Sequence, residues 1–287
     1  MQIKNVIKSM SYKIKQLTLR GIISWLAAKV ANCAMPWVKN LLIDWFISHY
    51  KVKIIEALET DPKKYPNLES FFVRALKPEA RPILGEARAI ISPADGTIMQ
   101  CGKIIDGVLI QAKGKFFSAE DLVGTKGKEF FHGDFVVIYL SPKDYHRVHM
   151  PVKGQLQSMQ VFPGGLFSVQ PRTITRVDQV FTRNERVVNF FITDFGPLAV
   201  VLVGAIIVGS IEMEWQGVVV RGGCACDQLA YDYSSREIQV ASGDEIGKFR
   251  FGSTVILLFP ENAAKLDVVP GQSIKMGERL GVELVSS

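Results

Sequence analysis

The sequence predicts an α+β protein, in which amphipathic N-terminal helices precede a β-rich core with the architecture of a barrel or a sandwich. Two observations carry this prediction. Before about residue 50, apolar residues recur at steps of three and four with lysines between them, which is typical of an amphipathic helix. After about residue 82, short β-branched or aromatic runs are separated by Gly, Pro and Asp, which indicates strands joined by tight turns.

The first helical segment is strongly basic. Ile3, Val6, Ile7 and Met10 follow the spacing of one helix face. The net charge of the protein is +6, and residues 1–43 hold seven basic residues and no acidic ones, so the remainder carries −1 (6 − 7). These basic residues are Lys4, Lys8, Lys13, Lys15, Arg20, Lys29 and Lys39. Positive charge concentrated at one end of the chain favours an anionic membrane, rather than a nucleic acid, as the partner.

The stretch from residue 21 to residue 45 is more apolar, but Lys29, Pro36 and Lys39 interrupt it. It holds no run of the roughly 20 uninterrupted apolar residues that a membrane-spanning helix needs. Its tryptophans are Trp25, Trp37 and Trp45. Lysines on one face and large apolar residues on the other favour a helix that lies in the membrane interface, so we expect a peripheral protein on the cytoplasmic face of the cell membrane. The alternative, helices packed on the protein's own core, leaves the absence of acidic residues unexplained.

We expect two domains, with residues 1–64 forming the membrane-associating helices and residues 65–287 forming the β-rich domain. Residues from about 65 to 82 are expected to form a connecting segment, which is punctuated by Pro62, Pro66, Pro78 and Pro82. The expected strands lie within residues 90–110, 135–140, 187–192, 198–209, 218–220 and 255–259. Short echoes within residues 204–209, 243–252 and 271–281 resemble the strand-turn pattern of lipoyl-like barrels.

The four cysteines do not follow a disulfide pattern. Only Cys224 and Cys226 are close together, and C-x-C is neither a disulfide framework nor the C-x-x-C motif of redox proteins. Together with Cys33 and Cys101 they are expected to be reduced thiols of a cytosolic protein.

The segment most informative about chemistry is residues 247–255, GKFRFGSTV. A Gly-Ser-Thr turn is common, so its meaning depends on the motifs that accompany it. These motifs are residues 92–96 (SPADG), 141–151 (SPKDYHRVHMP), 163–169 (PGGLFSV), 184–186 (NER) and 203–212 (VGAIIVGSIE).

Taken in order, from about residue 50 to residue 256, the motifs resemble those of bacterial membrane-associated phosphatidylserine decarboxylases. Several of them are five or more residues long, and together they extend over most of the chain. One departure is visible, because Phe251 stands where these enzymes commonly have Leu before Gly-Ser-Thr. The Gly252-Ser253 pair is intact, so this difference concerns the local packing alone.

The resemblance implies a proenzyme that cuts itself between Gly252 and Ser253 and converts Ser253 into a covalent pyruvoyl cofactor. The products would be a β chain, residues 1–252, and an α chain, residues 253–287, which stay associated and could form a homodimer of that pair. The pyruvoyl ketone would form a Schiff base with phosphatidylserine and act as the electron sink for its decarboxylation to phosphatidylethanolamine, in phospholipid biosynthesis. The β-rich domain would then be the catalytic one.

The resemblance also implies a triad of Asp95, His149 and Ser253 for self-cleavage. The residue types suit that chemistry, since glycine before the serine leaves the scissile carbonyl accessible and histidine can take the hydroxyl proton near neutral pH. An aspartate orients the imidazole and stabilises its cation. His146 is expected to assist decarboxylation or the later protonation. Without the family pattern, these side chains are equally explained as a turn, core histidines or a surface cluster.

Residues 163–169 are expected to form an exposed loop with two apolar tips, Leu166 and Phe167. A diacyl substrate needs an apolar approach, so this loop is expected to border the lipid entrance and these two residues to contact the substrate. The alternative is that both side chains pack inward.

Three other functions are alternatives to this one. A zinc hydrolase could use His132, His146, His149 and Cys224 or Cys226 as ligands, but no H-E-x-x-H or paired C-x-x-C spacing supports it, and we expect no metal. A non-enzymatic, membrane-bound lipoyl-like module would leave the histidine cluster and the Gly-Ser pair without purpose. A soluble pyruvoyl-dependent decarboxylase of a free amino acid would not need the basic N-terminus.

Overall fold

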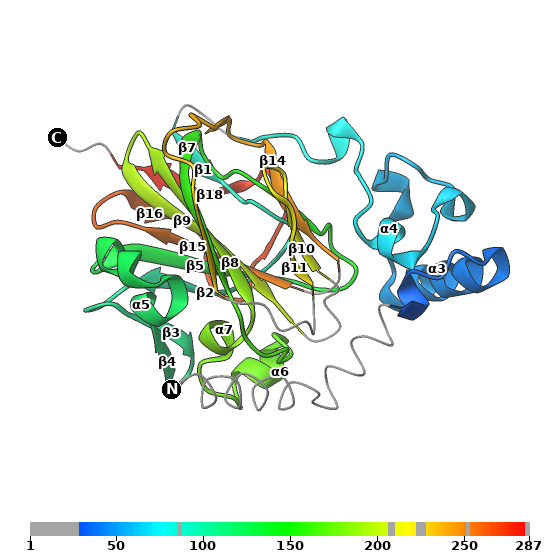
Figure 1. Cartoon of the computed structure of the whole chain (residues 1–287), viewed down its shortest axis with the longest axis horizontal. Coiled ribbons are helices and arrows are strands. Elements are labelled where there is room, and N and C mark those ends of the chain that lie inside the picture. The colour runs from blue at the N-terminus through cyan, green and yellow to red at the C-terminus, as the bar shows by residue number, and fades with distance from the viewer. Residues whose placement is uncertain (1–28, 85–87, 206–209, 222–227, 251–252, 285–287) are drawn as a thin grey trace, which may run out of the picture.

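The computed structural model describes residues 29–84, 88–205, 210–221, 228–250 and 253–284 (Figure 1). Several residues singled out in the sequence lie outside these ranges. They are Ile3, Val6, Ile7 and Met10, the basic residues before Lys29, Trp25, Cys224, Cys226, Phe251 and Gly252.

A nine-stranded sheet forms the centre of the fold, and all of its strand pairs are antiparallel. In spatial order its strands are β12 (Leu229–Asp232), β7 (Gly154–Phe162), β8 (Arg186–Thr193), β9 (Gly196–Gly204), β15 (Ser253–Phe259), β5 (Asp134–Leu140), β2 (Gly96–Lys103) and β17 (Ser273–Ile274), with β13 (Gln239–Val240) also pairing with β7. The β-branched runs of the sequence supply the middle of this sheet, because such side chains pack well on a pleated surface.

Smaller sheets surround the central one (Figure 1). A four-stranded sheet consists of β11 (Gly217–Arg221), β10 (Ser210–Met213), β14 (Glu245–Phe249) and β6 (Arg147–His149). A three-stranded sheet consists of β1 (Ala89–Ile91), β18 (Arg279–Glu283) and β16 (Ala264–Leu266), and a hairpin of β3 (Val108–Ala112) and β4 (Lys115–Ser118). The predicted α+β class with a β-rich core is confirmed, and the strands of the described ranges form open sheets rather than a closed barrel.

The central sheet has a hydrophobic core on each face, because successive residues of a strand point to opposite sides. In β15, Val255 and Leu257 belong to the first core, whose other members include residues of the four-stranded and three-stranded sheets. Ile256 and Leu258 belong to the second core, which also contains residues of the β3–β4 hairpin and of the short helices. Ser253 has the same parity as Val255 and Leu257, so its side chain faces the first core.

The helices are few and mostly short. They are α3 (Pro36–Tyr50), α4 (Leu68–Phe72), α5 (Ala119–Val123), α6 (Pro171–Ile174) and α7 (Val180–Arg183), with 3₁₀ turns η1 (Ile54–Glu56), η2 (Pro62–Lys64), η3 (Pro78–Ala80) and η4 (Thr125–Phe130). The helix α3 starts with a proline, whose missing N–H costs nothing there, and ends at Lys51 in a left-handed conformation. Among the described helices, none is both long enough and apolar enough to cross a membrane.

The helices α3 and α4 form a unit beside the β core (Figure 1). Its own hydrophobic cluster contains Ile43 and Phe46 of α3 together with Tyr65, Phe71 and Phe72. This packing crosses the boundary expected after residue 64.

The helical unit contacts the β core through α4 and the residues that follow it. The ring of Phe72 stacks on the imidazole of His146, with centroids 4.0 Å apart and an angle of 26° between the planes. Arg147 Nε donates to the carbonyl oxygen of Val73 at 2.9 Å. Arg250 donates from Nη1 to Glu69 of α4 and from Nη2 to Glu212 of β10, both at 2.7 Å.

Replacing Phe72 tests the energetic weight of this contact. Phe72 is 1% exposed, so Phe72→Ala removes a buried ring and leaves a cavity. We expect the free energy of unfolding to fall by about 3–5 kcal/mol, the usual cost of truncating a buried aromatic side chain. Chemical denaturation measures this difference, and Ile55→Ala is the control, because Ile55 is 74% exposed. A fall below about 1 kcal/mol for Phe72→Ala would contradict the described packing.

Candidate active site

The side chain of Ser253 is fully buried at the first residue of β15. Its strand neighbours are Gly204 at the end of β9 and Leu140 at the end of β5. The serine therefore sits at the edge of the first core, in the middle of the sheet, with paired backbone on both sides. A hydroxyl in such a place is shielded from water and can react only with groups that the fold supplies.

The group that the fold places beside this hydroxyl is His146, which immediately precedes β6. Ser253 Oγ lies 3.4 Å from His146 Nδ1, which is longer than a fully formed hydrogen bond. The other ring nitrogen, Nε2, donates to the carbonyl oxygen of Ser141 at 3.0 Å. This bond fixes the tautomer, so Nδ1 carries the lone pair and can accept the proton of the serine.

Burial and the nearby positive charge of Arg74 lower the pKa of His146 to about 3, although the bond to Ser141 opposes the shift. The imidazole is therefore neutral at physiological pH.

The second histidine of the motif, His149, is held by two different partners. Its Nδ1 donates to the carbonyl oxygen of Gly243 at 2.8 Å, and its Nε2 accepts the hydroxyl hydrogen of Tyr145 at 3.1 Å. Burial lowers the pKa of His149, while the bond to Gly243 and the charges of Glu245 and Asp95 partly oppose this effect.

Asp95, just before β2, binds a different set of groups. Its Oδ1 accepts from Arg81 Nε at 2.7 Å and from the backbone N–H of Met276 at 2.9 Å, while Oδ2 accepts from Arg81 Nη2. Arg81 Nη2 also donates to Glu56 at 2.9 Å. The fold thus holds the Asp95 carboxylate in a charged network and within electrostatic range of His149.

Of the four predicted side chains, the structure brings Ser253 and His146 into contact. Asp95 and His149 are linked less directly, since the backbone N–H of His149 donates to the carbonyl oxygen of Pro93 at 2.8 Å. The contacts described for His149 and for Asp95 do not include Ser253.

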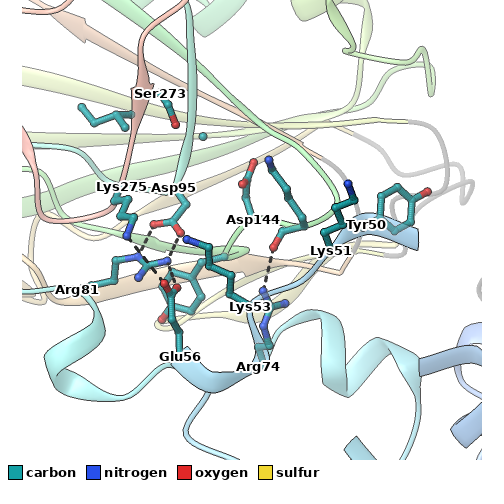
Figure 2. A pocket seen from close by; sticks show the side chains of 14 residues that line it. Tyr50, Lys51, Lys53, Glu56, Arg74, Arg81, Asp95, Asp144, Ser273 and Lys275 are labelled. Atoms are coloured by element: carbon teal, nitrogen blue, oxygen red, sulfur yellow. Dashed lines mark hydrogen bonds and ion pairs between the residues drawn. The ribbon is translucent and has the colours of Figure 1, made fainter. Parts of the chain in front are cut away.

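A pocket of about 390 Å³ opens beside Asp95 and Tyr145. Figure 2 shows that its charged side chains come from both the helical unit and the β core. The basic ones are Lys51, Lys53, Arg74, Arg81, Lys143 and Lys275, and the acidic ones are Glu56, Asp95 and Asp144. Arg74 is 4% exposed, and its Nε and Nη1 have no hydrogen-bond partner among the described residues. The excess of basic residues favours an anionic group in this pocket.

The sequence motifs alone assign no role to Arg74, Arg81, Tyr145 or Glu185. Tyr145 and Glu185 lie within the motifs of residues 141–151 and 184–186, so for these two the sequence does contain a signal. Arg74 and Arg81 lie in the segment interpreted as a connector, and only the folded chain brings them to the site.

The loop at residues 163–169 packs more closely than expected. Leu166 is 8% exposed, so the prediction of an exposed tip is wrong for this residue. The ring of Phe167 is half-buried, with the guanidinium of Arg183 4.3 Å from its centroid. The side chain of Asn184 binds the backbone of Phe167 and donates to the carbonyl oxygen of Gly204 at 2.8 Å. The loop thereby supports β9 next to Ser253.

In the part of the chain that the structure describes, no three His, Cys, Asp or Glu side chains gather in a way that could hold a metal ion. Cys33 and Cys101 are free thiols.

Comparisons with known proteins agree with the pattern of motifs. The family described as phosphatidylserine decarboxylase matches residues 68–282, and a second family, described as PSD, matches residues 21–51. The chain is similar to proteins named phosphatidylserine decarboxylase proenzyme from three bacteria. The protein of Saccharophagus degradans is 46% identical over 90% of this chain and 91% of its own length. That of Stutzerimonas stutzeri is 44% identical over 98% and 97%, and that of Pseudomonas putida 45% identical over 95% and 98%.

A match over this share of the chain, at this level of identity, decides the classification: the chain belongs to the phosphatidylserine decarboxylase family.

Proposed function

We propose that this protein decarboxylates phosphatidylserine to phosphatidylethanolamine in phospholipid biosynthesis, after cutting itself between Gly252 and Ser253. The relatives match this chain over nearly their whole length, and their name contains phosphatidylserine, which we take as the substrate here. The observation that carries the proposal is the position of Ser253, a fully buried hydroxyl at a strand end with a neutral imidazole nitrogen 3.4 Å away. A serine used only as a turn residue would need neither the burial nor the imidazole.

In the proposed self-cleavage, Ser253 Oγ adds to the preceding carbonyl carbon and replaces the amide with an ester. Elimination then breaks the Cβ–Oγ bond, which releases Gly252 as a carboxylate and leaves dehydroalanine at residue 253. One water molecule hydrolyses the imine tautomer of this residue, so that ammonia leaves and a pyruvoyl group remains. Such a group supplies the electron sink that amino-acid side chains lack. The surroundings fit it, because residue 253 is excluded from solvent and lies among neutral side chains.

The two products would remain associated. All seven residues of β15 are buried, and the strand pairs with β5 on one side and β9 on the other. Both neighbours precede the cleavage site in sequence, so the smaller chain would contribute the central strand of a sheet built mainly by the larger chain. Separation would expose two hydrophobic cores, which is strongly unfavourable.

For the base that activates Ser253, we keep the triad of Asp95, His149 and Ser253. The carboxylate of Asp95 supports it by raising the pKa of His149 against the effect of burial. To reach Ser253, His149 would have to exchange its bond to Tyr145 for one to the serine. The competing assignment gives the base role to His146, and its contact with Ser253 Oγ favours that reading.

Membrane association would follow from the exposed face of α3. Trp37, Leu41 and Trp45 are 69%, 64% and 52% exposed, and their spacing of four residues puts them on one side of the helix. Exposed apolar residues in a row suit insertion into a lipid interface. Lys39 does not share this role, because its Nζ donates to the carbonyl oxygens of Lys63 and Tyr65 at 2.5 and 2.7 Å.

Ser253→Ala tests the proposed function. The variant lacks the attacking hydroxyl, so it should stay uncut and form no phosphatidylethanolamine from phosphatidylserine vesicles. Ser253→Cys should cut itself slowly, because a thiol can also perform the acyl transfer. Lipid chromatography measures the phosphatidylethanolamine that each variant forms. The control is Ser234→Ala, because Ser234 is an exposed serine. Decarboxylation by Ser253→Ala at the wild-type rate would exclude residue 253 as the reaction centre.

The two histidine variants separate the competing assignments. With the triad, His149→Ala should slow self-cleavage by about 10²- to 10⁴-fold, since it removes the general base. His146→Ala should still be cut but should decarboxylate poorly. Gel analysis follows cleavage, and a lipid assay on the cut fraction follows decarboxylation. If His146→Ala is uncut while His149→Ala matures normally, the base is His146.

Acidic substitutions on the exposed face of α3 test its proposed contact with the membrane. Trp37→Glu combined with Leu41→Glu should weaken binding to anionic vesicles by more than about tenfold, because burial of each large apolar side chain contributes about 1.5–3 kcal/mol. Self-cleavage should not change, since neither side chain contacts the site. The matched control is Ile105→Glu combined with Phe116→Glu, two residues 67% and 52% exposed near the β3–β4 hairpin. Equal cosedimentation of both double variants would exclude α3 as the membrane contact.

A further inference from the structure

One carboxyl group near the site has no role in the function proposed above. Glu185, directly before β8, is 2% exposed, and its Oε1 has no hydrogen-bond partner among the described residues. Burial alone raises the pKa of Glu185 to about 8. The side chain is therefore mainly a neutral carboxylic acid at pH 7, which can donate a hydrogen bond.

The strand register places Glu185 in one row with Ser253. The backbone N–H of Gly204 donates to the carbonyl oxygen of Glu185 at 2.9 Å, and Gly204 is paired with Ser253 on its other side. Residues that lie opposite each other in a sheet point to the same face. Glu185, Gly204 and Ser253 therefore occupy three adjacent strands on the face of the first core.

Gly204 leaves open the space between the other two residues. A Cβ atom at Gly204 would lie 3.0 Å from Glu185 Cγ and 3.2 Å from Glu185 Oε1. The carboxyl group thus lies over the glycine backbone instead of turning away from β9. Gly204 is paired directly with Ser253, so Glu185 Oε1 lies over the residue next to Ser253, one strand away from its side chain.

A structural role explains this residue poorly. A buried polar atom without a partner costs about 1–3 kcal/mol, and an apolar side chain of similar shape would avoid that cost. Groups that are kept at such a cost concentrate at functional sites.

We propose that the neutral carboxyl group of Glu185 is a catalytic residue of self-cleavage, which donates a hydrogen bond to the carbonyl oxygen that becomes negatively charged. As Ser253 Oγ bonds to the Gly252 carbonyl carbon, the electron pair of the C=O bond moves to the oxygen, and the hydroxyl proton goes to the histidine base. The electron pair returns when the C–N bond breaks, and the nitrogen takes a proton from the histidine. Glu185 keeps its own proton throughout. This inference rests on the proposed function.

The test compares self-cleavage of two substitutions at one position, followed by gel and mass spectrometry. Glu185→Leu removes the donor but suits a buried site, so it should fold and cut itself about 10²- to 10³-fold more slowly, the usual loss for one such donor. Glu185→Gln retains an N–H donor and should recover most of the rate. The wild-type rate should fall above about pH 8 as Glu185 ionises, and Glu185→Gln should lack that fall.

Two further variants test whether the slower cleavage comes from the position of the Glu185 carboxyl group or from the loss of any buried carboxyl group. Gly204→Ala should displace the carboxyl group and slow cleavage, yet add little in combination with Glu185→Leu, because both changes remove the same contact. Asp134→Asn is the matched control, since this buried carboxyl lies opposite Phe259 at the far end of β15. Wild-type cleavage rates in Glu185→Leu and Gly204→Ala would overturn the inference while leaving the proposed function intact. A wild-type protein that is never cut would overturn the proposed function itself.

Discussion

The pairing of β15 in the middle of the central sheet is the constraint on which the rest of the structure depends. Its seven residues are buried and bonded on both sides, with apolar side chains supplied to both cores. This pairing fixes Ser253 at a strand end where the side chain can face only the first core. Any group that contacts this hydroxyl must therefore come from another element that converges on this point, and it has to be buried as well.

Burial of these groups determines their charge. His146 and His149 both have lowered pKa values, and Glu185 has a raised one, in each case mainly because burial disfavours the charged form. The immediate surroundings of Ser253 are thus neutral, whereas Asp95 and Arg81 form a salt bridge in the adjacent pocket. The helical unit contributes to this separation, because Phe72 covers the imidazole of His146.

Local patterns predicted the fold class and the β-rich core, since β-branched runs and turn residues act over a few positions. The motif pattern predicted Ser253 and His146, which the structure brings together. It could not predict that Tyr145 and Gly243 would hold His149, because these contacts depend on the tertiary packing of β6 and β14. The motif at residues 163–169 predicts an exposed tip at Leu166, but the support that Asn184 gives this loop cannot be seen from spacing. The row formed by Glu185, Gly204 and Ser253 depends on strand register, which sequence alone does not specify.

The proposed role of Ser253 is that of a buried reaction centre and not of a structural serine. An intact-mass spectrum of the purified protein tests this claim most directly. It should show a chain of 35 residues (287 − 252), whose mass is lower by one ammonia than that of the peptide beginning with an intact serine. The remaining 252 residues should appear as a second chain. A full-length chain alone after prolonged incubation, or a 35-residue peptide that retains its N-terminal serine, would contradict the account.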